Sequence, residues 1–138
     1  MQTILRILQQ AGGWHHGLYL MIENPPYMAL VIEATDESGP CGLPALSIAH
    51  YGERNGDLMR DPEMCFELGF IEGPHLSVFY YRNDYVGVEQ WSRTIVRDNY
   101  VYLASLHQQH ERFAKVWDNN LRLQGFAEAF EQQQTPRA

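Results

Sequence analysis

The sequence predicts an α+β protein with an N-terminal helix, an antiparallel meander of five or six strands, and a long C-terminal helix packed on one face of the sheet. Three observations indicate this order. Apolar residues recur at helical spacing near both ends of the chain. Short runs rich in branched and aromatic residues fill the middle. Clusters of Gly, Pro, Asn and Asp separate these runs and favour tight turns between neighbouring strands.

Residues 2–11 are predicted to form the first helix. Its apolar residues share one stripe at helical spacing: Ile4, Leu5, Leu8 and Ala11. Gly12 and Gly13 follow at once, and glycine readily adopts the left-handed conformation that ends a helix. Because so short a helix is marginal on its own, its apolar stripe is expected to pack against the rest of the protein.

The central part of the chain is expected to form strands, which we place at 18–23, 28–34, 45–51, 64–70, 76–82 and 85–96. Two prolines in the first gap and the Gly/Pro-rich stretch 35–44 predict turns or loops there. Side chains alternate along the third run, so that Leu46, Ile48 and His50 share one face. Gly87 in the last run is a candidate β-bulge.

A long helix is predicted over residues 99–124, with Asp98 as its N-cap. The apolar stripe of this segment includes one histidine: Leu103, Leu106, His110, Phe113, Trp117 and Leu121. Gly125 interrupts the pattern, and the residues after it are expected to add a final turn or two. We expect a single domain over residues 1–132 and a frayed tail at 133–138.

The charge of this chain is concentrated in one segment. Residues 23–72 hold ten acidic side chains against Arg54 and Arg60, a net charge of −8 in a chain whose total is −7. An acidic surface argues against direct nucleic-acid binding, which needs Lys and Arg facing phosphate, and it fits a protein partner with a basic surface. Solubility alone is the plainer explanation of the same charge.

The cysteines and the lack of a membrane segment indicate a cellular compartment. No apolar run is long enough to cross a membrane, and the N-terminus lacks the features of a signal peptide. We therefore expect a cytoplasmic protein whose cysteines Cys41 and Cys65 are free thiols. Cys41 stands in a Gly/Pro loop with nothing basic flanking it, so an unreactive thiol is expected.

The stretch HYGERNGDLMRDPEM, residues 50–64, carries the main candidate site. Its candidate binding residues are His50, Glu53, Asn55, Asp57, Asp61 and Glu63. In structural terms we expect a long loop between two strands. Asn55 and Gly56 favour a turn, and Pro62 should not lie in a central strand, so the next strand would begin after it.

In functional terms the same stretch would be a metal or acid/base cluster, for which His50, Asp57 and Asp61 are the candidate ligands. The spacing does not match an EF-hand, which needs a Gly and a Glu at fixed positions. A protein-binding loop is the third interpretation. The structural interpretation is the simplest of the three, and neither a metal nor a cofactor is expected.

Other candidates carry weaker signals. His107, His110 and Glu111 on the predicted helix have a spacing at which two histidines can share a metal, but buried or solvated histidines explain them more simply. No nucleophile motif and no Gly-rich phosphate loop occurs. A candidate aromatic surface for a protein partner comprises Tyr80, Tyr81, Tyr85 and Trp91, although half of such residues are expected to pack under the long helix.

Two blocks of sequence indicate a relationship. AHYGERNGDLMRDPEMCFEL resembles the H-Y-x-E-x-N-G-D-L-M-x-D-P-E-M segment of a family of small uncharacterised proteins from bacterial plasmids, phages and integrative elements. FAKVWDNNLRLQGF resembles the C-terminal helix of the same family. The resemblance implies an accessory protein of a mobile element, and small acidic proteins in that setting often resemble inhibitors of host defence, of anti-CRISPR or antirestriction type.

Together these features predict a non-catalytic protein-binding protein that uses its acidic segment to engage a basic partner. Two alternatives stay open. One is a metal-binding protein or hydrolase-like enzyme with His50 and the nearby carboxylates as its site. The other is a structural homodimer that pairs through an exposed strand edge or sheet face.

Overall fold

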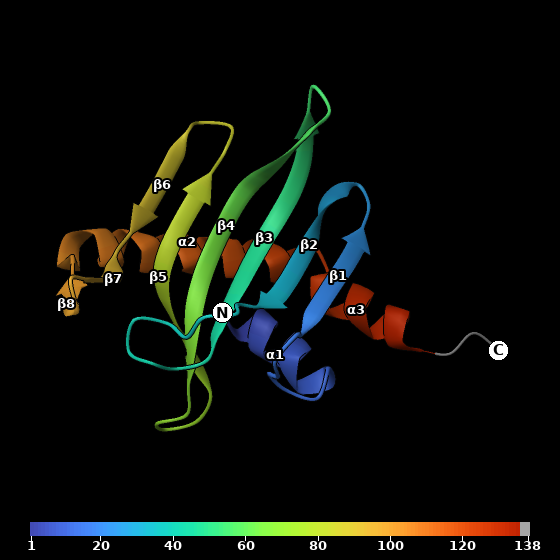
Figure 1. Cartoon of the computed structure of the whole chain (residues 1–138). Coiled ribbons are helices and arrows are strands. Elements are labelled where there is room, and N and C mark those ends of the chain that lie inside the picture. Colours follow the sequence, from blue (N-terminus) through green and yellow to red (C-terminus); the bar gives the residue numbers. More distant parts are fainter. Residues whose placement is uncertain (136–138) are drawn as a thin grey trace.

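The computed structural model describes residues 1–135 and confirms the predicted α+β order of helix, antiparallel meander and C-terminal helices (Figure 1). The helices are α1 (Gln2–Gln10), α2 (Ala104–Leu123) and α3 (Phe126–Gln134). The main sheet has six strands in chain order: β1 (Tyr19–Asn24), β2 (Tyr27–Ala34), β3 (Ala45–Arg54), β4 (Asp57–Gly69), β5 (His75–Asn83) and β6 (Val88–Trp91). A separate hairpin of β7 (Arg93–Val96) and β8 (Asn99–Tyr102) precedes α2.

The helices cover one face of the main sheet, and α2 runs across the strands behind it in Figure 1. Successive residues of a strand point to opposite faces, so alternate side chains supply the sheet's half of the core. The large, fully buried residues come from all three helices and from β1 to β4: Ile4, Ile7, Ile22, Leu30, Ile32, Leu46, Ile48, Met64, Phe66, Leu121, Phe126 and Phe130. Each such side chain stabilises the fold by about 1.5–3 kcal/mol relative to an exposed one.

The start of α1 is fixed by a residue of α2. The backbone N–H groups of Gln2 and Thr3 donate to the carboxylate of Asp118, at 3.3 and 3.0 Å. These groups have no partner inside the helix, and a negative charge at a helix N-terminus is favourable. The buried stripe of α1 differs slightly from the predicted one and consists of Thr3, Ile4, Ile7 and Leu8.

The prediction of a long loop over residues 50–64 is wrong. β3 and β4 continue through this stretch as paired strands and meet at a two-residue turn. Asn55 and Gly56 form the turn with φ angles of 53° and 85°, which is the turn chemistry that an Asn-Gly pair favours. Pro62 lies inside β4 at a bulge, where β4 has one residue more than β3, so the interrupted ladder tolerates a residue without an N–H group.

The predicted strand over 85–96 is two strands. Ser92 separates β6, which pairs with β5, from β7, which pairs only with β8. Gly87 is not at a bulge but in the turn between β5 and β6, where its φ is 65°. The chain therefore leaves the main sheet after Trp91 and forms a hairpin of its own.

The predicted long helix begins later than expected. Arg97 and Asp98, with φ angles of 51° and 66°, form the turn of the β7–β8 hairpin, so Asp98 is not a helix cap. The next residues, NYVY, pair as β8 because branched and aromatic side chains favour a strand. α2 begins at Ala104, and none of the described helices is long and apolar enough to cross a membrane.

The C-terminal end is more helical than predicted. After Gly125, which has a φ of 80°, α3 continues to Gln134, so the first two residues of the predicted tail are helical. α3 packs beside β1 and α1, at the edge of the sheet (Figure 1). The last part of the predicted tail, 136–138, lies outside the described residues.

Candidate functional site

The face of the sheet that the helices leave uncovered, here called the open face, is hollowed over β1 to β4. Eight residues line a hollow of about 500 Å³: Tyr19, Met21, Ala29, Val31, Glu33, Tyr51, Leu58 and Arg60. Cross-strand pairing places Tyr19 beside Glu33, and Leu58 beside Glu53. Tyr19, Met21 and Leu58 expose 58%, 46% and 74% of their surface. Large exposed apolar side chains gathered on one surface are typical of a binding site.

The carboxylates of the open face differ in how they are neutralised. Glu63 is paired, because Arg60 Nε lies 3.4 Å from it. No ion pair within residues 1–135 reaches Glu23, Glu33 or Glu53, and strand alternation places all three on the open face. The hollow therefore presents exposed apolar side chains next to unneutralised negative charge.

The predicted binding residues at the centre of the 50–64 stretch lie at the tip of the β3–β4 hairpin. Glu53, Asn55 and Asp57 are all exposed there, and the tip projects beyond the neighbouring strands (Figure 1). Glu53 belongs to β3, Asn55 to the turn, and Asp57 to the start of β4. These three residues thus share an exposed end of the sheet.

The remaining carboxylates of the stretch lie further along β4 and are engaged in local contacts. Asp61 accepts a hydrogen bond from the side-chain amide of Asn83, at 2.6 Å. Glu63 accepts one from the hydroxyl of Ser47 on the open face. Both carboxylates therefore fix neighbouring strands to one another.

His50 points to the opposite face, toward the helices, as the alternation of β3 requires. Its ring lies between Trp117 and Phe126, with ring centroids 5.6 and 5.4 Å away. His50 is only 8% exposed, and this burial lowers the pKa of its imidazole below the ordinary value. His50 is therefore a neutral, buried residue, separated by the sheet from Glu53 and Glu63.

The candidate metal ligands His50, Asp57 and Asp61 do not converge. In the described part of the chain, no group of three or more His, Cys, Asp or Glu side chains is arranged as a metal site. Asp57 is the exposed first residue of β4, Asp61 lies four residues further along that strand, and His50 faces the core. The geometry gives the acid/base interpretation of this stretch no support.

The histidines of α2 also point in different directions. His107 Nδ1 lies 2.9 Å from the carboxylate of Glu111. His110 is buried, and its Nε2 donates to the side-chain oxygen of Gln90 at 3.0 Å. Burial, with a smaller contribution from His107, lowers the pKa of His110. Each histidine thus has its own partner, as in the simpler interpretation of the sequence.

The four aromatic candidates do not form one surface. Tyr80 and Trp91 pack together on the open face, with ring centroids 5.1 Å apart. Tyr81 faces the helices and packs against Phe113 at 5.3 Å. Tyr85 lies in the turn between β5 and β6, 36% exposed. Of these four candidates, only Trp91, at 45% exposure, offers a large aromatic surface on the open face.

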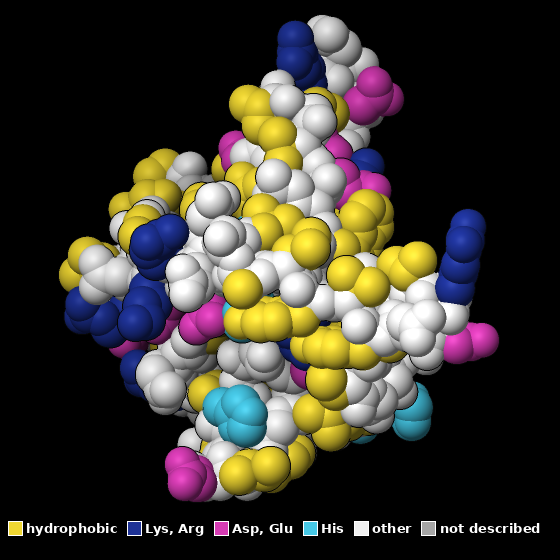
Figure 2. Space-filling model, turned by 90° about the vertical axis from the view of Figure 1, so that its left-hand side faces the viewer, with side chains coloured by type: hydrophobic (Ala, Val, Ile, Leu, Met, Phe, Trp, Pro, Cys, Tyr) yellow, Lys and Arg dark blue, Asp and Glu magenta, His cyan; other side chains and the backbone are white. Residues whose placement is uncertain are grey.

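A second exposed apolar surface lies on the β7–β8 hairpin. Figure 2 shows this side of the molecule, with hydrophobic side chains gathered across the middle of the view. Five residues of the hairpin and its end are 48–50% exposed: Ile95, Val96, Tyr100, Tyr102 and Leu103. The sequence did not predict this surface, because the helix expected over 99–124 assigned Leu103 to a buried stripe.

The other end of the open face is covered by the loop between β2 and β3, which Glu67 holds in place. Glu67 Oε2 accepts hydrogen bonds from the backbone N–H groups of Cys41 and Leu43, at 2.9 and 3.2 Å. Its Oε1 lies 2.7 Å from Arg93 Nη1. Gly39 lets the loop approach, since a Cβ there would lie 2.1 Å from Glu67 Cγ. In the sequence, Glu67 is the one charged residue of the otherwise apolar run MCFELGF, and this position is the signal that could have indicated a buried, paired carboxylate.

The two cysteines are free, as predicted. Cys41 is exposed, and the guanidinium of Arg93 reaches it from β7, with Nη1 3.5 Å from Sγ. The sequence neighbours of Cys41 do not reveal this contact. Cys65 is buried on the open face, and burial raises the pKa of its thiol to about 12.

A family model described as a domain of unknown function (DUF6908) matches residues 2–127. The chain belongs to this family. The DUF6908 match begins with α1 and ends just inside α3, so it spans the whole sheet, the β7–β8 hairpin and α2. No curated protein and no solved structure is significantly similar to this DUF6908 chain.

Proposed function

We propose that this chain is a non-catalytic protein-binding protein whose open-face hollow engages a partner with a basic surface. One observation carries the proposal. The hollow and its rim combine exposed apolar side chains with carboxylates that no ion pair within residues 1–135 neutralises: Tyr19, Met21 and Leu58 with Glu23, Glu33 and Glu53. An apolar centre with a charged rim is typical of protein interfaces.

The charge of the hollow favours one class of partner. A Lys- and Arg-rich surface would find its complement in the carboxylates, and complementary charge speeds association and excludes wrong partners. Proteins that bind nucleic acid present such surfaces. A nucleic acid itself would be repelled, because its phosphates carry the same sign as the hollow.

The sequence resemblance supports a biological context. The block at residues 49–68, which resembles proteins of plasmids, phages and integrative elements, includes most of the β3–β4 hairpin and three of the eight residues that line the hollow. We infer an accessory protein of a mobile element that inhibits a host defence complex, of anti-CRISPR or antirestriction type. The positive groove of such a complex is the kind of surface that the hollow fits.

The test begins with capture of the partner from bacterial host lysate by the tagged protein, identified by mass spectrometry. The affinity of the purified pair is then measured at low and high ionic strength by calorimetry. Because the interface relies on opposite charges, the affinity should fall as salt rises. The double variant Glu33→Lys, Glu53→Lys should weaken binding by about tenfold or more, mainly by slowing association.

Glu72→Lys is the matched control. It makes the same charge change as each of those two substitutions, within the acidic segment, but its turn between β4 and β5 lies at the opposite end of the sheet from the β3–β4 tip (Figure 1). It should bind as the unmodified protein does. Leu58→Ser removes an exposed apolar contact and should weaken binding without harming the fold. An affinity that changes neither with salt nor in the double variant nor in Leu58→Ser would exclude the hollow as the interface.

Light scattering of the purified protein separates this proposal from the homodimer alternative. A monomer with an accessible hollow is expected. A stable dimer that dissociates on substitution of Leu58 would mean that the hollow binds a second copy of the chain instead.

A further inference from the structure

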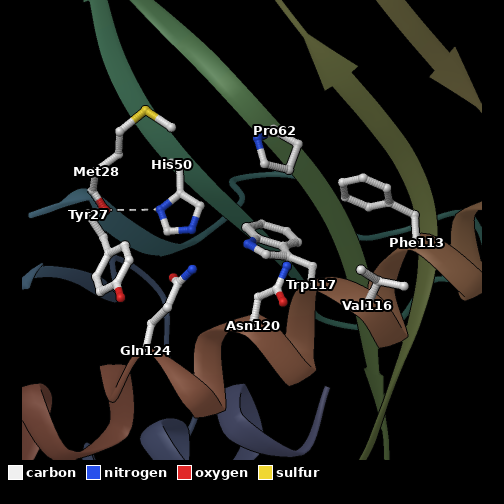
Figure 3. A pocket seen from close by; sticks show the side chains of 9 residues that line it. All are labelled: Tyr27, Met28, His50, Pro62, Phe113, Val116, Trp117, Asn120 and Gln124. Carbon is white, nitrogen blue, oxygen red and sulfur yellow. Dashed lines mark hydrogen bonds between the residues drawn. The ribbon is translucent and has the colours of Figure 1, made fainter.

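A cavity on the helix-covered side of the sheet, independent of the open-face hollow, is built like a small-molecule site. It has a volume of about 250 Å³ and lies between the C-terminal half of α2 and the strands β2, β3 and β4 (Figure 3). Residues of α2 at spacings of three and four line one wall, and His50 lies at the opposite wall. The cavity is larger than the roughly 150 Å³ that holds one benzene molecule, so it has room for a molecule of one or two rings.

His50 presents a hydrogen-bond acceptor to this cavity. Its Nδ1 lies 3.1 Å from the carbonyl oxygen of Met28 and 3.4 Å from that of Ala29. A carbonyl only accepts, so Nδ1 carries the proton and Nε2 keeps its lone pair. Burial lowers the pKa of His50, which keeps the ring neutral. No hydrogen bond within residues 1–135 uses Nε2.

Trp117 presents a donor beside this acceptor. The side chain is 4% exposed, and its indole N–H is buried without an acceptor in the described part of the chain. Figure 3 shows the nitrogen edge of Trp117 turned toward His50, and the two ring centroids are 5.6 Å apart. Buried donors without partners are rare in native proteins, because desolvation costs free energy that no bond returns.

The rest of the cavity suits a flat molecule. Met28, Pro62 and Phe113 contribute apolar surface, and the tilted rings of His50 and Trp117 form its inner wall. Apolar walls with a few convergent polar groups are the usual composition of a ligand pocket. An apolar molecule alone would leave both the acceptor and the donor unpaired.

We propose that this cavity binds an uncharged planar molecule of one or two rings that carries an N–H donor beside a carbonyl or ring-nitrogen acceptor. The ligand N–H donates to Nε2 of His50, and its acceptor receives the indole N–H of Trp117. The side-chain amides of Asn120 and Gln124, which also line the cavity, are placed to contact the outer edge of the molecule. Nucleobases and aromatic amides belong to this chemical class.

The experiment titrates the intact ¹⁵N-labelled protein with uracil, with nicotinamide, and with toluene as a flat probe that has no hydrogen-bonding group. The readout is the indole ¹⁵N–¹H resonance of Trp117, assigned with Trp117→Phe. Uracil or nicotinamide should shift this resonance in a saturable way, because the indole N–H of Trp117 gains an acceptor. The indole of Trp14 is the internal control, since it already donates to the carbonyl of Ala45 at 3.0 Å.

Two variants locate the binding. Val116→Trp changes a lining residue that is 60% exposed, so the fold should tolerate it while the added ring obstructs the cavity and abolishes the shift. His50→Phe keeps a flat ring but removes the acceptor, and it should weaken binding of the responsive probe by about tenfold or more. The proposal is overturned if neither uracil nor nicotinamide shifts the Trp117 indole of the folded protein, or if Val116→Trp responds as the unmodified protein does.

Discussion

The carboxylate of Glu67 lies 2.7 Å from the guanidinium of Arg93, and the two side chains are 1% and 7% exposed. The pair joins the central strand β4 to the β7–β8 hairpin and sits beneath the loop between β2 and β3. Arg93 also donates to the carbonyl oxygens of Val78 and Ser77. The ion pair thus joins strand β4, the loop between β2 and β3, and the β7–β8 hairpin, which lies outside the main sheet.

Breaking this pair should destabilise the protein strongly. Removing one partner of a buried ion pair leaves the other charge without compensation, at a cost of about 3–5 kcal/mol. Glu67→Gln and Arg93→Met should each lower the free energy of unfolding by about that amount, measured by urea denaturation. Arg6 and Glu131 form an equally short but exposed pair at 2.6 Å, so Arg6→Met should leave the urea midpoint nearly unchanged. Equal effects of Arg6→Met and Arg93→Met would contradict this assignment.

The turn of the β7–β8 hairpin should be open to stabilisation. Arg97 and Asp98 both adopt left-handed backbone conformations, which cost non-glycine residues roughly 1–2 kcal/mol each. The double substitution Arg97→Asn, Asp98→Gly supplies the residues that this turn prefers and should slow amide hydrogen exchange in β7 and β8. The reverse change, Asn55→Arg with Gly56→Asp, should speed exchange at the tip of the β3–β4 hairpin. Unchanged exchange in both hairpins would contradict the prediction.

Acid should destabilise the fold through His50 and His110. Burial lowers the pKa of both imidazoles in the folded protein, so below the ordinary histidine value the unfolded chain binds more protons than the folded one. The free energy of unfolding should therefore fall as the pH drops from about 7 toward 5, by at most about 1.4 kcal/mol per pH unit for each histidine. Urea midpoints measured across this range check the slope. His110→Gln should reduce it, and a profile identical to that of the unmodified protein would show that His110 does not contribute.

The sequence predicted the order of elements because hydrophobic periodicity reflects burial. The strand prediction was wrong where strands extend beyond the core. The outer half of the β3–β4 hairpin has no buried face, so GERNGDLMR shows no alternation and resembled a loop. The predicted start of α2 was wrong for another reason. Leu103 fits the helical spacing by chance, while the strand preference of NYVY and the turn at Asp98 decide the structure locally.

The sequence grouped His50 with Glu53 and Glu63 as candidate binding residues, and strand alternation explains why the structure separates them. His50, Glu53 and Glu63 are close in sequence, yet the pleat sends His50 to the helices and both carboxylates to the open face. The alternation of residues 45–51 already placed His50 with Leu46 and Ile48. The partner of His50, Trp117, is far away in sequence, and only the fold brings the two together.

Gln133 protects the β1 edge of the sheet. Its side-chain amide donates to the carbonyl oxygen of Met21 and accepts the backbone N–H of Glu23, both at 3.2 Å, so it occupies the outer groups of β1 as another strand would. Unpaired groups on an edge strand invite pairing with a second copy of the chain. Gln133→Ala should therefore speed hydrogen exchange at the amide of Glu23 and increase self-association in light scattering at high protein concentration. Gln132→Ala, a change at the neighbouring exposed residue, should alter neither quantity. If both variants behave alike, other features of β1, such as its short length and the packing of α3, keep this edge from pairing.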